Sequence, residues 1–186
     1  MKQLLMILAS LSLLIFNFQA NALGKKKSKP MQTVDYVEPG LFVGRWYQIS
    51  RNRLIFEPKV CDCAQQTLKV IAPNTLSVYN SCNQGSPEGK LRSISGEATN
   101  VDTKTNAKFS IDFGLPWKGK YWIIGLAGDY HWAVVSDPKR RSLYILSKTP
   151  TLSDESYKDA IAVAQTQIST KKLLRTSHEG CSYPEM

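Results

Sequence analysis

The stretch Gly44-Arg45-Trp46-Tyr47-Gln48-Ile49 decides the fold, because it opens the first of eight segments with the composition of β-strands. The eight segments cover residues 44–53, 60–71, 75–83, 90–99, 106–114, 119–127, 130–137 and 141–149. Turn-forming residues separate most of them, among them Pro73-Asn74, Gly128-Asp129 and Asp137-Pro138. Short strands joined by such turns favour an antiparallel meander that hides its edges by closing. The sequence therefore predicts an all-β fold, an eight-stranded antiparallel up-and-down β-barrel.

A barrel of eight strands has room inside for one small ligand. Residues 108–113 alternate between polar and apolar side chains, so one face of that strand should be buried and the other wet. Applied to the other strands, the same alternation gives a mainly apolar lining with one polar group, as small-molecule sites usually have. The predicted ligand-binding residues are Leu68, Val78, Asn80, Phe109, Ile111, Phe113, Tyr121, Ile123 and Tyr144.

Two further segments should cover the barrel. Residues 36–43 form a short candidate plug. A single helix is expected to start near Ser153, which can cap it, with Asp154 and Glu155 at its positive end. An apolar stripe at helical spacing then follows, made by Tyr157, Ala160, Ile161, Ala164 and Ile168. This C-terminal α-helix should pack outside the barrel, against strands that are apolar on both faces.

The N-terminus has the pattern of a cleaved secretory signal over residues 1–22, with Lys2 before an apolar stretch and a final Ala20-Asn21-Ala22. A basic, flexible lead-in should follow over residues 23–34, and the folded domain over 35–186. The first cysteine, Cys61, lies far beyond the cleavage region, so a lipid anchor on the N-terminus is not expected.

Charge narrows the range of partners. The chain has 24 Lys and Arg against 15 Asp and Glu, a net charge of +9. Most of the excess lies in Lys25-Lys26-Lys27 with Lys29, in Lys139-Arg140-Arg141, and in Lys171-Lys172 with Arg175. We interpret these clusters as a solvated tether, a hairpin tip and a polar helix end. The alternative is a peripheral contact with an anionic membrane surface. Nucleic acid is disfavoured, because no basic and aromatic stacking module is evident.

Four cysteines, Cys61, Cys63, Cys82 and Cys181, suit an oxidising compartment. Cys61 and Cys63 should point the same way on one strand, so a bond between them would strain it. One of them is therefore expected to reach Cys82 and the other Cys181, without a choice between the two arrangements.

Catalysis has little support in the sequence. His131 and His178 have no metal-ligand spacing, and both are interpreted as surface histidines. No serine has a nucleophile elbow, and Asp62, Asp112 and Asp129 form no recognisable carboxylate pair. No catalytic residue, metal site or cofactor is predicted.

The blocks of sequence, taken in order, resemble the lipocalin family, specifically its bacterial lipocalin and apolipoprotein D branch. The resemblance covers about residues 35–181, and its specificity comes from the order and spacing of the blocks. The matching blocks are Gly44-Arg45-Trp46-Tyr47-Gln48-Ile49, Phe56-Glu57, Val78-Tyr79-Asn80, Gly96-Glu97-Ala98, Ala107-Lys108-Phe109, Tyr121-Trp122-Ile123-Ile124, Asp129-Tyr130 and Leu143-Tyr144-Ile145-Leu146-Ser147-Lys148-Thr149-Pro150.

The resemblance implies a lipocalin calyx whose narrow end is closed by Trp46, with Gly44 letting the backbone pass beneath the indole. Lys148 stands where the family has an arginine across that tryptophan, so the closed end should be retained but less tightly bonded. Cys63 resembles the cysteine that bonds the C-terminal tail in apolipoprotein D, which favours Cys63 with Cys181 and Cys61 with Cys82. Tyr144 matches an aromatic residue of the family pocket.

The resulting hypothesis is a periplasmic or secreted carrier or scavenger of fatty acids or lysophospholipids that binds without chemical change. One alternative is isomerisation by a cavity thiol, as in the prostaglandin D synthase branch, which would need a free, activated cysteine. The other is a protein-interaction module of the cell envelope that acts through loops near Lys139 to Arg141 or Pro116-Trp117-Lys118.

Overall fold

The computed structural model describes residues 29–52 and 60–183. The predicted signal at 1–22, most of the lead-in and the Phe56-Glu57 block lie outside the described residues. The strands are β1 (Gly44–Asn52), β2 (Cys61–Ala72), β3 (Thr75–Gln84), β4 (Lys90–Asn100), β5 (Lys108–Asp112), β6 (Gly119–Leu126), β7 (Trp132–Ser136), β8 (Leu143–Ser147) and β9 (Leu173–Arg175). The helices are α1 (Pro39–Phe42) and α2 (Asp154–Gln165).

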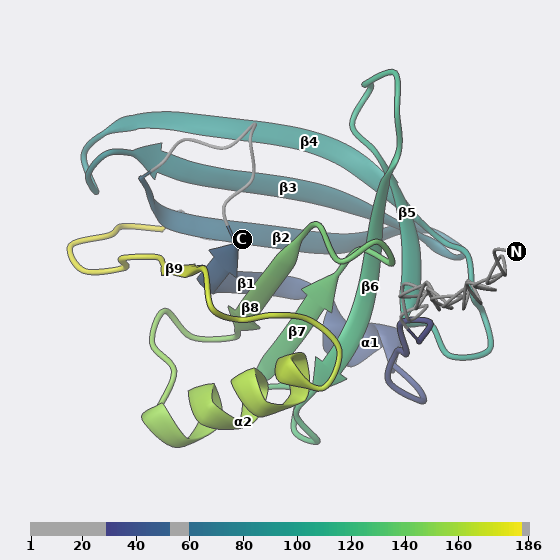
Figure 1. The fold of residues 1–186 in the computed structure, drawn as a ribbon. Helices are drawn as coiled ribbons and strands as arrows, with labels where there is room; N and C mark the ends of the chain where they lie inside the picture. Colours follow the sequence, from purple (N-terminus) through teal and green to yellow (C-terminus); the bar gives the residue numbers. More distant parts are fainter. Residues whose placement is uncertain (1–28, 53–59, 184–186) are drawn as a thin grey trace, which may run out of the picture.

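Strands β1 to β8 form a closed antiparallel barrel, which confirms the predicted fold class (Figure 1). Each strand from β2 to β8 pairs with its neighbours in chain order, and β1 closes the ring by pairing with both β8 and β2. In this closure Gly44 lies opposite Leu68, and Tyr47 lies opposite both Gln65 and Ser147. Closure leaves the eight barrel strands without a free edge between β1 and β2.

Two apolar clusters hold the barrel together. The first fills the inside of its closed end around Trp46 and Phe42. The second lies outside the barrel between the sheet and α2, where Ala160 and Ala164 are fully buried against β6, β7 and β8. Strands that are apolar on both faces are therefore covered by the inner cluster on one side and by the outer cluster on the other, as expected.

Helix α2 lies across the outside of the barrel over β6 and β7 (Figure 1). Ser153 caps it by accepting a hydrogen bond from the Ser156 backbone N–H at 3.2 Å. The approach is close at Gly125 of β6, where an added Cβ would lie only 2.6 Å from Cγ1 of Val163. The predicted cap and packing face are both present, and the absence of a side chain at Gly125 leaves room for α2 to pack closely on β6.

The C-terminal region differs from the sequence-based expectation. Lys171, Lys172 and Arg175 do not form a polar helix end, because α2 ends at Gln165. Instead Leu173–Arg175 form β9, which pairs with the end of β1 from Ser50 to Asn52. Three residues carry too little periodicity for a strand to be predicted, and only the exposed end of β1 makes the pairing possible.

The N-terminal segment packs earlier than the predicted boundary at residue 35. Met31 is buried in the outer cluster, and the Val34 N–H donates to the carbonyl of Ile123 at 3.0 Å. The expected plug contains α1, whose Phe42 is buried beside Trp46. Among the described residues, no helix has the length and apolar character needed to span a membrane.

Candidate functional site

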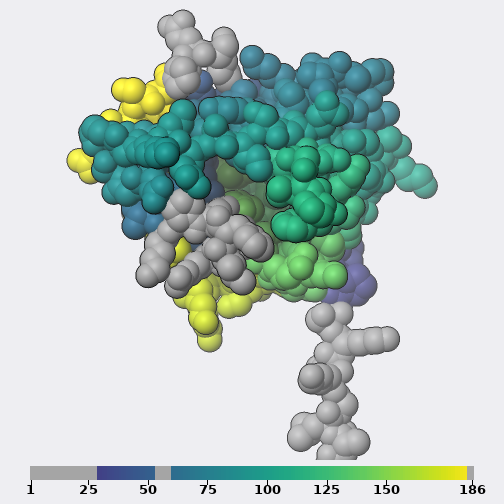
Figure 2. All heavy atoms as spheres, turned by 90° about the horizontal axis from the view of Figure 1, so that it is seen from above, coloured from purple at the N-terminus to yellow at the C-terminus, as the bar shows by residue number. Residues whose placement is uncertain are grey.

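The inside of the barrel contains a cavity of about 1140 Å³ above the closed end. It opens on the side where Figure 2 shows a hollow between the teal segments of β3 and β4 and the green segments beyond them. Its size is slightly above the range of ordinary small-molecule sites, about 300–1,000 Å³. The barrel is therefore hollow enough to hold an elongated ligand.

Five of the nine predicted ligand-binding residues line this cavity. They are Asn80, Ile111, Phe113, Tyr121 and Tyr144. They come from β3, β5, β6 and β8 and from the residue that follows β5, so the lining is shared around the barrel. Ala64, Ile94 and Leu146 add further apolar surface.

The other four predicted residues, Leu68, Val78, Phe109 and Ile123, are not among those that line the cavity. All four are buried in the closed-end cluster with Trp46. Alternation identifies the inward face of a strand but not the height of a residue along the barrel axis. Leu68 pairs with both Gly44 and Val78, which places it at the filled end.

Trp46 closes the barrel as the resemblance implied. It is fully buried, and its Nε1–H donates to the carbonyl of Phe42 at 2.7 Å. The Lys148 Nζ lies 4.1 Å from the centre of the indole and donates to the carbonyl of Val43 at 2.7 Å. Burial lowers the pKa of Lys148 to about 8. Lys148 therefore joins the indole to the plug segment through both a cation-π contact and a hydrogen bond.

Gly44 has a different role from the one expected. An added Cβ would find only Nζ of Lys148 within 4 Å, at 3.8 Å, so close packing does not require a glycine there. The backbone has a φ of +93°, which side chains rarely tolerate, and this explains the glycine. The Asp129-Tyr130 block contributes to the same end, because the Tyr130 hydroxyl accepts a hydrogen bond from the Glu38 N–H at 2.8 Å.

A set of polar groups lies part way up the cavity. The Tyr121 hydroxyl donates to Oε1 of Gln66 at 2.9 Å, and burial raises the pKa of Tyr121, so the hydroxyl stays protonated. Gln66 pairs with Asn80 across β2 and β3. The Oδ1 atom of Asn80 is buried without a hydrogen-bond partner in the structure. A ligand hydroxyl or water could satisfy this acceptor.

Basic side chains surround the upper part of the cavity. Arg51, Arg92, Lys118, Lys120 and Arg141 line it, and Asp137 is the only acidic residue among the described lining residues. The carboxylate of Asp137 is already used, since it accepts hydrogen bonds from the backbone N–H groups of Arg141 and Ser142 and from Nε of Arg141. The described part of the mouth is therefore electropositive.

The predicted site did not include these basic residues, although strand alternation in the sequence is enough to identify one of them. The inward stripe of β4 runs from Ala98 through Gly96 and Ile94 to Arg92, so counting by twos toward the open end reaches Arg92. Arg51 could not be reached by counting, because the pairing of β1 with β8 shifts between Gln48 and Ser50.

All four cysteines are paired. Cys61 is bonded to Cys82, and Cys63 is bonded to Cys181, with Cα atoms 5.4 and 5.6 Å apart. The expectation that Cys61 and Cys63 point the same way is wrong, because β2 has a register shift between Asp62 and Gln65 and Cys63 has a φ of +55°. The Cys61–Cys82 bond lines the cavity, but neither sulfur is a free thiol.

The two histidines bind neighbouring segments rather than a metal. His131 contacts Asp129 through Nδ1 and Ser156 through Nε2, the latter at 2.9 Å, and so ties the β6–β7 turn to the start of α2. His178 contacts the Tyr183 hydroxyl and the carbonyl of Gln48, and burial lowers the pKa of this histidine. Within residues 29–52 and 60–183, no group of His, Cys, Asp and Glu side chains could hold a metal ion.

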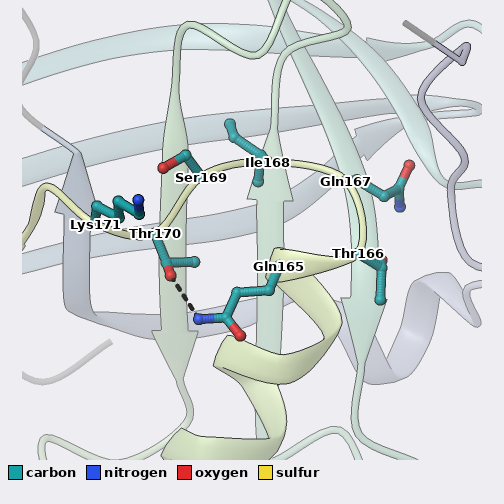
Figure 3. Close-up of a pocket in the computed structure, with 7 residues that line it drawn as sticks. All are labelled: Gln165, Thr166, Gln167, Ile168, Ser169, Thr170 and Lys171. Atoms are coloured by element: carbon teal, nitrogen blue, oxygen red, sulfur yellow. Dashed lines mark hydrogen bonds between the residues drawn. The ribbon is translucent and has the colours of Figure 1, made fainter.

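A smaller hollow lies on the surface after α2. It has a volume of about 430 Å³ and is lined by residues 165–171 alone, with Gln165 donating to Thr170 at 2.9 Å across it (Figure 3). The residues come from one continuous segment and are mostly polar. This hollow has neither the depth nor the apolar lining of the barrel cavity.

Known proteins share this sequence pattern. The family model described as a lipocalin-like domain matches residues 37–178. Temperature-induced lipocalin-1 of Arabidopsis thaliana is 30% identical over 146 residues, covering 74% of this chain and 77% of the relative. The outer membrane lipoprotein Blc of Escherichia coli strain K12 is 32% identical over 123 residues, covering 66% and 68% of the two chains.

Solved structures share the architecture. Insecticyanin from the tobacco hornworm Manduca sexta superimposes with a TM-score of 0.66 at 21% identity, over 84% of this chain and 89% of that one. At this identity the likeness concerns the fold. The sequence matches, the closed barrel and the tryptophan at its base agree with one another, and the chain therefore belongs to the lipocalin family.

Proposed function

We propose that this protein binds single-chain lipids, fatty acids or lysophospholipids, inside the barrel and carries or scavenges them in the bacterial cell envelope. Lipocalins bind small hydrophobic ligands, and the single observation that supports this ligand class best is the shape of the cavity. It is apolar between Ile111, Phe113 and Leu146, and it is basic at the mouth. A lipid tail would lie toward Trp46 and its head group at the opening.

The energetics favour a long acyl chain. Each methylene buried contributes about 0.8 kcal/mol. A chain of roughly fifteen carbons therefore gains about 12 kcal/mol, which is enough for micromolar affinity after an association cost of ~4 kcal/mol. No covalent chemistry is needed for this role, and the cavity disulfide leaves no thiol for the isomerase alternative.

The polar groups fit the other end of the ligand. Arg92 and Lys120 can attract a carboxylate or phosphate at the mouth. The buried Oδ1 atom of Asn80 calls for a hydrogen-bond donor, such as a glycerol hydroxyl. Both features support an amphiphilic ligand with an anionic head over a purely apolar one.

The sequence and the disulfides support a location outside the cytoplasm. Two disulfides suit a protein outside the cytoplasm. The relative Blc is an outer membrane lipoprotein by name. For this chain we propose secretion through residues 1–22 and release without a lipid anchor. Sequencing the N-terminus of the exported protein tests this, since a free Leu23 is expected and a longer, uncleaved chain would contradict it.

The ligand proposal is tested by native mass spectrometry of the purified protein and by displacement of a fluorescent fatty acid. A copurifying lipid and saturable displacement are expected. The variant Phe113→Glu should weaken displacement by more than tenfold, because it puts a carboxylate into the lining. The control Val101→Glu introduces the same carboxylate at an exposed position outside the cavity and should leave displacement unchanged. No bound lipid and no displacement by the unaltered protein would overturn the proposal.

A further inference from the structure

The loop between β5 and β6, residues 113–118, projects apolar side chains at the mouth of the cavity. We call it the rim loop. Leu115 is 45% exposed and Trp117 is 59% exposed. All four tryptophans of the chain are described, and the other three are buried or half-buried, Trp46 completely. Exposed tryptophan is typical of surfaces that contact a partner or a lipid interface.

The surroundings of the rim loop are basic. Lys118 lies in the loop itself, Lys120 follows it, and Arg92 of β4 lines the same cavity. Lys118 is 3.2 Å from the carboxylate of Asp112, and both side chains remain exposed. In the described part of the chain, no acidic side chain lies within ion-pair distance of Arg92, and Lys120 bonds only the hydroxyl of Ser110. An apolar tip therefore sits among cations that acidic side chains only partly neutralise.

This combination has a specific meaning for lipid surfaces. Tryptophan prefers the head-group level of a bilayer, where its ring is apolar and its N–H is wet. Nearby lysine and arginine side chains are attracted to anionic lipids, and this attraction decays over about one Debye length from the membrane surface. The position of the apolar tip at the rim of a lipid-sized cavity favours a lipid surface over a protein partner.

We propose that the barrel docks mouth-first on an anionic lipid bilayer. The rim loop enters the head-group layer, and Lys118, Lys120 and Arg92 face the acidic head groups. Trp117 and Lys118 also line the cavity, so a docked barrel opens directly onto the lipid. A lipid can then pass between bilayer and cavity without crossing water. The docking itself rests on the surface alone, whereas the transfer step rests on the proposed function.

The test uses the full mature chain and two kinds of vesicle, phosphatidylcholine alone and phosphatidylcholine mixed with phosphatidylglycerol. Sedimentation with the mixed vesicles is expected, and salt should weaken it. Phosphatidylglycerol brominated in its acyl chains should quench tryptophan fluorescence, and Trp117→Phe should remove most of the quenching, because Trp117 is the exposed indole and the other three are buried or half-buried.

Charge-reversal variants distinguish binding through the mouth from non-specific attraction caused by the net charge of the protein. Lys118→Glu with Lys120→Glu should weaken binding to the mixed vesicles by roughly tenfold or more. The matched control is Lys104→Glu with Lys158→Glu, which changes the net charge equally on the β4–β5 turn and on α2, away from the mouth. The control should bind within about twofold of the unaltered protein. Circular dichroism checks that each variant is folded.

Three results would overturn the proposal: no sedimentation with the mixed vesicles, equal loss in both pairs of variants, or quenching that survives Trp117→Phe. Displacement of the fluorescent fatty acid in solution is measured on the same proteins. If the unaltered protein binds the mixed vesicles but does not displace the fatty acid, the carrier function is overturned and the docking surface stands. If the unaltered protein displaces the fatty acid but does not bind the mixed vesicles, the docking surface is overturned and the carrier function stands.

Discussion

Replacing Trp46 by phenylalanine measures how firmly the closed end of the barrel is held. The exchange keeps an aromatic ring in a fully buried site but removes the Nε1–H that donates to the carbonyl of Phe42 at 2.7 Å. A buried acceptor left without its partner costs about 1–3 kcal/mol. The smaller ring also leaves a void and a weaker cation-π contact with Lys148, which lies 4.1 Å from the indole centre. We expect the free energy of unfolding to fall by about 2–4 kcal/mol.

The assay is urea unfolding followed by far-UV circular dichroism, which does not depend on the number of tryptophans. Trp117→Phe is the matched control, since it makes the same exchange at a side chain that is 59% exposed. The control should change the free energy of unfolding by no more than about 0.5 kcal/mol. Equal small effects from the two exchanges would refute the view that Trp46 seals the barrel.

Three other predictions concern stability. Burial lowers the pKa of Lys148 from 10.5 to about 8, so the folded chain gives up this proton before the unfolded chain does. The free energy of unfolding should therefore rise between about pH 8 and 10 relative to the variant Lys148→Met, and a parallel pH profile of the two proteins would contradict this. Replacing both Cys63 and Cys181 by serine removes a disulfide that spans 118 positions in the sequence, and the chain-entropy model predicts that the free energy of unfolding falls by about 5 kcal/mol. Removing the Cys61–Cys82 disulfide, which spans 21 positions, should lower it by about 3 kcal/mol. Burial lowers the pKa of His178 below its ordinary value of 6.5, so stability of the tail should be lost as the pH falls below 6.5 and the histidine is forced to protonate. Residues 176–183 should then show faster hydrogen exchange, His178→Phe should remove this pH dependence, and unchanged exchange would count against the prediction.

Much of the fold could be predicted because each strand has its own local signal. Turn residues mark the hairpins, and alternation marks the inward face of β5. The cap at Ser153 and the stripe that follows were equally local. Strand β9 was missed because its pairing depends on where β1 extends past its pairing with β2, which no short window of sequence contains.

The site was only partly predictable for a related reason. Period-two counting separates inside from outside, so Ile111, Phe113 and Tyr121 were identified. It does not give depth, so Leu68 and Val78 were expected in the cavity and lie in the closed-end core. Bulges change the face without changing the composition, and Arg51 reaches the cavity after one of them.

The central claim is that the barrel is a hollow container for one lipid tail, closed at its base by Trp46. Dissociation constants of a series of saturated fatty acids test it most directly, with titration calorimetry or displacement as the readout. If each added methylene enters the cavity, affinity should increase by about fourfold per carbon until the tail reaches the closed end, and then stop increasing. An affinity that does not depend on chain length would contradict the claim.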